Sequence, residues 1–566
     1  MHLRGMPRVP FHEIVWRALM VVWPTEKLPV HASQAVVAAN HPYASAAGIS
    51  MIAAGGNVAD AAVAAIFACG VVEPQMVGPL GGGYIVFREA SGSELVIDNY
   101  AEAPGRASET MYTPDPSAGF GMVVGQHNMT GHLACGIPGN LKGWLHLHQL
   151  KGSLPLAQVM QPAIDAAEHG IPVTPYLRMS IESQAKELRQ YPSSTAIFMP
   201  GGEMPKVGTM LRNPDQAETL RAIAKEGGDY LYRGPLGDAL VRDMQANGGL
   251  ITHEDLQQYE VREVPSIKGT YRGYGIIGTP PSSGGGILNQ LGMNILENFD
   301  LRSLGFGTAR YWHVIIETLK LMFADRNKYL GDPNFVDFPQ EALLDKAYAK
   351  ERAALIKMDI PQQYEGGEPA PKMDGHTTHL TVMAADGSTV TMTQTINMGF
   401  GARAVVPGTG LLLNDNMALF DARPGRPNSI APYKRMLTAT AATILERDGE
   451  TVAALGTPGG IRIFPAVLQG ILNLIDHEMT IQEAVEAPRV WCNGLVTEIE
   501  AIASDKTVAE LESMGHKLNV VPAVAGNMNG VQRDPATGML VGGACWRGNG
   551  GPVGVSGGLA KTRMNW

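Results

Sequence analysis

The chain has 566 residues, of which 45% are apolar and 17% charged, so it can bury a large core and lacks the composition of a disordered protein. Its length fits several domains or one large α/β unit. The net charge of −10 and the lack of a basic stripe argue against nucleic acid or an anionic membrane surface as a partner.

Neither the cysteines nor the N-terminal apolar run indicates a secreted or membrane protein. The four cysteines show no C-x-x-C spacing, which favours reduced, mostly buried thiols over a disulfide framework or a zinc site. The apolar run at residues 18–23 is too short for a signal-peptide core or a membrane span. We therefore expect a cytoplasmic protein.

The first clear elements lie between residues 44 and 98. An Ala-rich stretch predicts a short helix that Gly55 and Gly56 close, since glycine favours the C-terminal cap. A second helix should start near Asn57 or Asp60, and because it is apolar on nearly every face we expect it to be buried between layers. Strands are predicted at 84–88 and 94–98, and helical patterns dominate at 154–247 and 309–357.

A hairpin is predicted in the second half of the chain. Apolar and polar residues alternate on both sides of the Asp-Gly pair at 386–387, which suits a type I′ turn. Pairing residue 385 with residue 388 would place Thr378 opposite Thr395 and Thr377 diagonal to it.

A polar segment at 362–376 is the best linker candidate, and it leads straight into Thr377. No G-x-S-x-G, H-E-x-x-H or Walker A motif occurs. Threonine is a weak nucleophile, but the α-amine of an N-terminal threonine has a reference pKa of about 7.7–8 and can act as a built-in base. A cut before Thr377 would create that amine, and Gly459 and Gly460 could donate backbone N–H groups to an oxyanion. The alternative is that Thr377 and Thr378 are ordinary strand residues.

The sequence D-x-x-T-T-H at 374–379 and many further motifs resemble the γ-glutamyltransferase family of N-terminal nucleophile (Ntn) hydrolases. The motifs include NHPYASAAG, VVEPQMVGPLGGG, FADRNKYLGDPNF, APYKRML and GTPGG, and the resemblance extends from residue 32 to the C-terminus. It implies an α/β fold, a four-layer αββα sandwich, and self-cleavage between His376 and Thr377. The fragments 1–376 and 377–566 would stay intertwined in one globular unit, as a heterodimer or a higher oligomer built from it.

The resemblance also implies roles for individual residues, and it implies no metal or organic cofactor. The residues are Thr377 as nucleophile, Thr395 to orient it, Asn397 to contact its amine and the substrate, Gly459 and Gly460 as the oxyanion hole, and Thr438 in the acyl pocket.

Where the family reads an amino-acid head group with charged side chains, this chain has neutral ones. The family's D-x-R-E-x-A-P becomes DNYAEAP at 98–104, so Tyr100 replaces the arginine that pairs with the α-carboxylate. N-N-Q-M-D-D-F becomes NDNMALF at 414–420, so Asn416 replaces the glutamine, and Ala418 and Leu419 replace the aspartates that bind the α-amino group. Loss of such charged partners removes selectivity for that head group.

Other polar residues near these motifs have two readings. Arg403 and Tyr433 are unusual for the family and could anchor a distal carboxylate of the substrate, or could serve loop packing or surface charge. Asp325 and Arg326 of the FADR motif are expected to form a structural pair, and His379 to be a structural histidine.

These departures resemble the subgroup that contains cephalosporin acylases of γ-glutamyltransferase type. We therefore predict an amide hydrolase that cleaves a small-molecule N-acyl or dicarboxylic-acid amide through an acyl-enzyme on Thr377. One alternative is a γ-glutamyl hydrolase or transferase, similar to a glutathione hydrolase. The other is an uncleaved, non-catalytic homologue that acts as a scaffold or binding protein.

Overall fold

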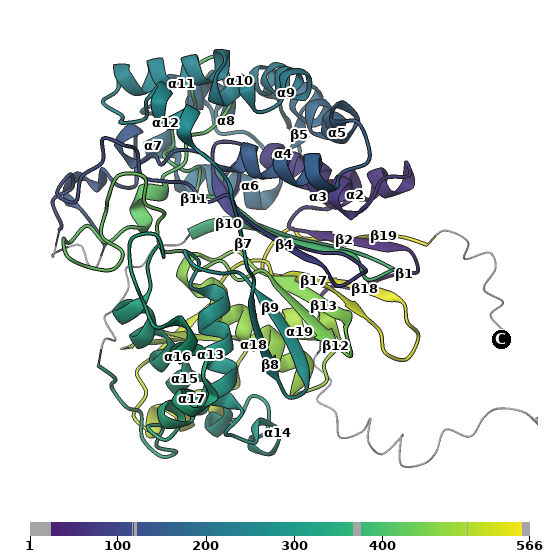
Figure 1. Ribbon diagram of the computed structural model, residues 1–566, viewed down its shortest axis with the longest axis vertical. Helices are drawn as coiled ribbons and strands as arrows, with labels where there is room; N and C mark the ends of the chain where they lie inside the picture. Colours follow the sequence, from purple (N-terminus) through teal and green to yellow (C-terminus); the bar gives the residue numbers. More distant parts are fainter. Residues whose placement is uncertain (1–23, 116, 118–120, 366–374, 495, 557–566) are drawn as a thin grey trace, which may run out of the picture.

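Two β-sheets lie face to face at the centre of the molecule (Figure 1). The computed structural model describes residues 24–115, 117, 121–365, 375–494 and 496–556. The first sheet contains, in spatial order, β19 (Val553–Val555), β2 (Ala35–Ala39), β10 (Gly375–Ala384), β11 (Thr389–Met398), β3 (Gly82–Arg88), β4 (Glu94–Asp98) and β7 (Arg262–Val264). The second contains β1 (Val30–Ala32), β18 (Leu540–Ala544), β17 (Asn529–Arg533), β13 (Glu450–Gly456), β12 (Thr443–Arg447), β9 (Tyr274–Gly278) and β8 (Ile267–Tyr271).

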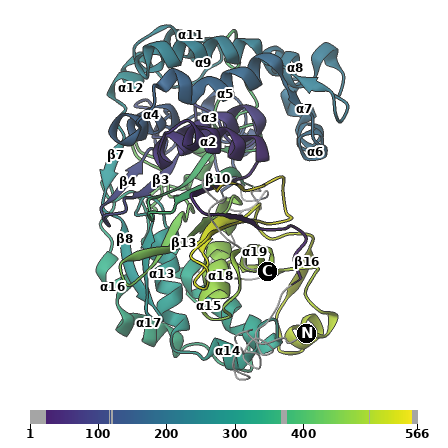
Figure 2. The same ribbon diagram turned by 90° about the vertical axis from the view of Figure 1, so that its right-hand side faces the viewer.

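Helices cover the outer face of each sheet, as the two views show (Figures 1 and 2). On the first sheet lie α2 (Pro42–Ala53), α3 (Val58–Val72) and α4 (Asn140–Lys151), with α5 (Leu156–His169), α9 (Pro214–Glu226) and α11 (Pro235–Ala246) further out. On the second lie α13 (Gly285–Leu296), α15 (Ala309–Tyr329), α18 (Ile463–Ile475) and α19 (Ile481–Glu486). This order of layers confirms the predicted αββα sandwich.

Shorter elements complete the layers. The short helices are α6 (Pro175–Ser183), α7 (Ala185–Leu188), α8 (Pro192–Phe198), α10 (Asp229–Tyr232), α12 (His253–Gln258), α14 (Leu301–Leu304), α16 (Gln340–Leu344), α17 (Lys346–Ala353) and α20 (Asp505–Ser513). One small sheet consists of β14 (Val490–Cys492), β15 (Thr497–Glu500) and β16 (Leu518–Val521). Another consists of β5 (Ile171–Pro172) and β6 (Met210–Leu211).

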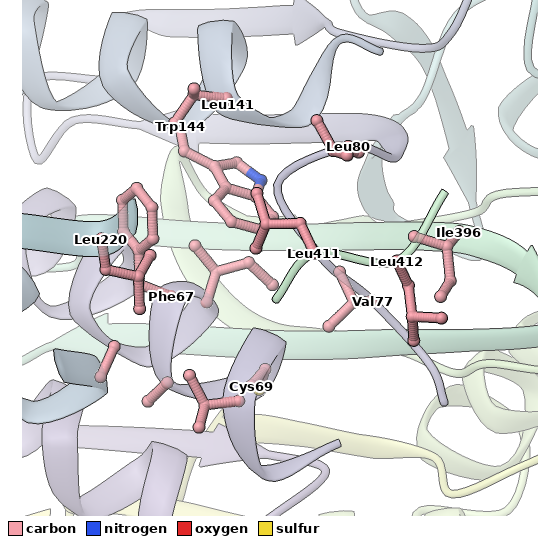
Figure 3. Packing of buried hydrophobic residues seen from close by; sticks show 14 of the residues in the cluster. Phe67, Cys69, Val77, Leu80, Leu141, Trp144, Leu220, Ile396, Leu411 and Leu412 are labelled. Atoms are coloured by element: carbon pink, nitrogen blue, oxygen red, sulfur yellow. The ribbon is translucent and has the colours of Figure 1, made fainter. Parts of the chain in front are cut away.

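Helix α3 is the buried helix that the sequence predicts. It begins after Asn57, whose side chain and that of Asp60 each accept a hydrogen bond from the other's backbone N–H, a capping box. Every residue of α3 is buried. Phe67 meets Trp144 of α4 edge to face, with ring centroids 5.0 Å apart (Figure 3). The Trp144 indole donates a hydrogen bond to Gln394 at 3.1 Å, which ties this helix layer to the central strand β11.

The β10–β11 hairpin departs by one residue from the predicted register. Ala384, not residue 385, bonds to Ser388, and Gly387 adopts φ 91°. The loop therefore has three residues with glycine in the left-handed position, instead of the two of a type I′ turn. As a result Thr378 pairs with Gln394 and not with Thr395.

A β-bulge lies at the start of β10. Between the pair His376–Asn397 and the pair Thr378–Gln394, Thr377 of β10 faces two residues of β11, Thr395 and Ile396, so the extra residue of the bulge is on β11. The bulge thus lies at the bond that the sequence analysis predicts to be cut.

The cysteines and helices agree with the composition. All four cysteines are buried and free, as predicted. Across the described residues, no helix combines the length and the apolar character that crossing a membrane requires.

Candidate active site

Thr377 and Thr395 meet where β10 begins, and both are almost fully buried. Oγ1 of Thr377 donates a hydrogen bond to Oγ1 of Thr395 at 3.1 Å. Thr395 in turn donates to the backbone carbonyl of His376 at 2.5 Å, and that carbonyl belongs to the His376–Thr377 peptide bond. The N–H of Asn397 donates to Thr395 Oγ1 at 2.8 Å and so fixes the direction of the hydroxyl. One hydroxyl therefore touches both the candidate nucleophile and the bond that precedes it.

Asn397 is held by Asp415, a buried residue that the sequence analysis did not single out. Asn397 has a φ of 79°, and its Nδ2 donates to the carbonyl of Asp415 at 3.1 Å. The carboxylate of Asp415 accepts from the N–H of Met398 at 2.9 Å. Burial raises the pKa of Asp415 to about 7, against the opposing effect of the nearby Arg403. The sequence did contain a signal for Asp415, because this residue stands in NDNMALF where the corresponding family motif has asparagine.

Gly459 and Gly460 form a turn between β13 and α18 that touches the chain ahead of Thr377. Their φ values, 140° and 57°, lie where glycine avoids the strain that a side chain would impose. Gly375 packs on this turn so closely that a Cβ on it would lie 2.6 Å from Cα of Gly460. Gly460 also lines the pocket of Thr377. Backbone N–H groups of this turn are therefore near the place where an oxyanion would form.

Thr377 opens into a pocket of about 30 Å³. Of the charged residue types, the described part of its wall includes one, Arg326. The wall consists of Tyr100, Arg326, Thr377, Thr395, Asn397, Leu419, Leu437, Thr438, Ala439, Thr440, Gly460, Ile461 and Ile463. The pocket thus gathers Tyr100, Thr438 and Leu419 around the threonine pair.

Neutral side chains stand at the positions where the resemblance implies contacts to an amino-acid head group. Tyr100 is 2% exposed, and burial raises the pKa of its phenol far above the usual value. Leu419 presents an aliphatic chain to the same pocket. Asn416 is fully buried, and neither polar atom of its amide has a hydrogen-bond partner within the described structure. Asn416 lies outside the described pocket wall.

Arg403 and Tyr433 also lie outside the described wall of this pocket. The guanidinium of Arg403 donates to the carbonyls of Met129 at 2.5 Å and Gly401 at 2.6 Å, and it lies 3.4 Å from Oδ2 of Asp415. Tyr433 packs against Gly105 beside α12. Both side chains are thus committed to loop packing, one of the two readings that the sequence allowed.

We expect Arg403→Met to destabilise the protein by about 3 kcal/mol at pH 8, because the buried Asp415 would lose its cation. The loss should grow as the pH rises above 7. Wild-type Asp415 with its pKa of about 7 then ionises, whereas in the variant it must stay protonated in the folded state. Thermal unfolding between pH 6 and 8.5 measures the effect. Asp415→Asn in the same chain should restore most of the stability, and a single variant as stable as the wild type would contradict the pairing.

Thr378 and His379 have structural partners. Oγ1 of Thr378 donates to Oε2 of Glu73 at 3.0 Å, and burial raises the pKa of that carboxyl to about 7. His379 bonds to Thr393 at 2.9 Å and Thr381 at 3.1 Å, and burial lowers its pKa to about 3. His379 is therefore a neutral structural histidine, as predicted.

The expected pair of Asp325 and Arg326 does not form, and that prediction was wrong. Asp325 bonds instead to Arg352 at 2.9 Å and to the hydroxyl of Tyr348 at 3.0 Å. Neighbouring residues of a helix point about 100° apart, so Arg326 faces the pocket while Asp325 faces α17.

Comparison with known proteins agrees with this site. A family profile described as Gamma-glutamyltranspeptidase matches residues 44–555. The chain belongs to this family. The acylase ACY 1 proenzyme of Pseudomonas sp. (strain SE83) is 47% identical over 543 residues, which cover 95% of this chain and 96% of the relative. The glutathione hydrolase proenzyme of Escherichia coli (strain K12) is 38% identical over 512 residues, 88% of each chain.

A solved structure gives the same result for this γ-glutamyltranspeptidase family member. The crystal structure of cephalosporin acylase from Bacillus halodurans superposes with a TM-score of 0.85 at 29% identity, over 94% of this chain and 98% of that one. The family and these relatives make the chain an amide hydrolase of the Ntn type, and they set aside the non-catalytic alternative.

Proposed function

We propose that the chain is a precursor that cuts itself between His376 and Thr377. Oγ1 of Thr377 would attack the His376 carbonyl carbon, and the amide nitrogen would take up a proton and become the free α-amine. Water would then hydrolyse the resulting ester and leave a carboxylate on His376. The hydrogen bond from Thr395 to that carbonyl carries the proposal, because it withdraws electrons from the bond under attack. The proenzyme names of two relatives also support it.

In the mature enzyme, Thr377 would attack the amide carbonyl of a substrate. Its amine would accept the hydroxyl proton and pass it to the leaving nitrogen, which departs as an amine. N–H groups of the Gly459–Gly460 turn would stabilise the oxyanion. Water would then release the acyl group as a carboxylic acid and restore Thr377.

The acyl group would be one without a free α-amino-acid head group, such as that of a dicarboxylic-acid amide. Tyr100 and Leu419 line the pocket where the family supplies an arginine and an aspartate, so a zwitterionic head group would lose its charged partners. The names of the acylases among the relatives, ACY 1 and cephalosporin acylase, agree with this choice. The second candidate, a γ-glutamyl hydrolase or transferase, is favoured by the glutathione hydrolase relative.

One assay with two substrates separates these candidates. Glutaryl and γ-glutamyl amides of the same aromatic amine differ only in the α-amino group of the acyl chain. We expect kcat/KM for the glutaryl compound to exceed that for the γ-glutamyl compound by about 10- to 100-fold, because the ammonium group of the γ-glutamyl chain has no carboxylate partner where Leu419 replaces an aspartate. A preference for the γ-glutamyl compound would overturn the proposed substrate class and favour the second candidate.

A further inference from the structure

Arg326 lies in the last turn of α15 and borders two cavities. One is the small pocket of Thr377, and the other is a larger cavity of about 400 Å³. Leu419, Leu437 and Ile461 also line both, so the two spaces adjoin along an apolar strip. An acyl chain too large for about 30 Å³ could therefore leave the Thr377 pocket along this strip and pass Arg326.

The guanidinium of Arg326 has no acidic partner among the described residues. Its Nε is buried and lacks a hydrogen-bond partner there, and Nη1 donates to Asn327 at a long 3.3 Å. The neighbouring carboxylate, Asp325, is held by Arg352. Burial lowers the pKa of Arg326 to about 10, and no nearby carboxylate offsets that effect. An unpaired cation with a planar fork of donors is suited to a carboxylate.

Among the described residues that line the larger cavity, arginine and lysine outnumber aspartate and glutamate. Arginine and lysine side chains contribute Arg326, Lys328, Arg352, Arg423 and Arg426, against Asp325, Glu365 and Asp421. Two of these acids are already paired, Asp325 with Arg352 and Asp421 with Arg423. The cavity next to the threonine therefore favours an anionic group on the substrate.

We propose that Arg326 binds the distal carboxylate of the acyl group, and so selects dicarboxylic over monocarboxylic acyl chains. The apolar strip holds the methylene groups between the amide at Thr377 and the carboxylate at Arg326. This inference rests on the proposed function and deepens it, because it assigns the contact with the distal carboxylate to Arg326 and not to Arg403 or Tyr433.

The test compares glutaryl and pentanoyl amides of the same aromatic amine, which differ in the distal carboxylate. Arg326→Gln should lower kcat/KM for the glutaryl amide by 10- to 100-fold, the usual loss for a hydrogen-bonded charged group. The pentanoyl amide should change less than threefold. Arg326→Lys, which keeps the charge but loses the fork, should lie between wild type and Arg326→Gln. Lys350→Gln, which removes an exposed cation of α17 outside the described walls of both cavities, should change the ratio less than twofold.

Each rate is divided by the fraction of cut chain seen on a denaturing gel. This correction separates an effect of the variant on substrate turnover from an effect on maturation. If Arg326→Gln stays uncut, the test depends on Arg326→Lys. An Arg326→Lys enzyme with the wild-type ratio of kcat/KM for the glutaryl and pentanoyl amides would overturn the proposal. Equal losses for both substrates, or an equal effect of Lys350→Gln, would also overturn it while leaving the proposed function intact. The proposal would also be overturned if Arg326→Gln lowered kcat/KM only for substrates whose carboxylate is on the amine part of the amide. A wild type that does not hydrolyse the glutaryl amide would overturn both proposals.

Discussion

Thr377→Ala should leave the chain uncut and abolish amide hydrolysis, a loss of about 10⁴-fold or more. Alanine removes the only side-chain atom that could attack the His376 carbonyl, and without the cut no α-amine forms at residue 377. The β-branched methyl contributes little by comparison, so the fold should persist. On a denaturing gel, wild type should show two fragments, 1–376 and 377–566, and the variant one.

Thr377→Ser is the matched control, because it keeps the hydroxyl and loses only the methyl group. It should still mature, more slowly, and the N-terminal sequence of its smaller fragment should begin STHLTV. A Thr377→Ala chain that is still cut at this bond would refute the assignment of the nucleophile. Two wild-type fragments that meet at any other bond would do the same.

Thr395→Val should slow maturation and turnover by about 100-fold or more, the typical cost of removing one donor to a developing oxyanion. Valine has nearly the shape of threonine, so the change deletes the hydroxyl with little effect on packing. The donor to the His376 carbonyl at 2.5 Å is lost, and Thr377 loses its partner at 3.1 Å. Time courses of cleavage in purified precursor and rates with the glutaryl amide measure the two effects.

Thr393→Val tests whether any buried threonine of β11 has this effect. Thr393 lies on the same face of the strand, and its hydroxyl bonds to His379 at 2.9 Å, away from the cut bond. Its loss should lower the melting temperature but leave the rate of cleavage within about threefold of wild type. Equal slowing by Thr393→Val and Thr395→Val would show that the network acts only through stability.

Local patterns predicted the elements around the site. The cap at Asn57, the uniformly apolar α3 and the strands β3 and β4 follow from residues close together in sequence. The hairpin was predicted, but its predicted register was wrong by one residue. Asp-Gly fits both a two-residue loop and a three-residue loop with glycine in the left-handed position, and the sequence alone does not distinguish them.

Charged side chains of the site were the hardest to place. An arginine reaches far enough to choose among partners that only the fold brings together. Arg403 therefore pairs with Asp415 across a loop, and Arg326 turns away from its neighbour Asp325 toward Thr377. The residues on strands and tight turns, such as Thr395 and Gly460, have no such freedom, and the structure gathers them around Thr377.

The strand order affects how the protein can fold before the cut and unfold after it. In the first sheet, β10 and β11 lie between β2 and β3, and in the second, β18, β17, β13 and β12 lie between β1 and β9. A cut at residue 376 would leave each sheet woven from both pieces, so neither piece could bury its strands alone. The intact chain would therefore be needed for folding, because it holds the strands of both fragments together. After the cut, unfolding would separate the two fragments and would no longer be reversible.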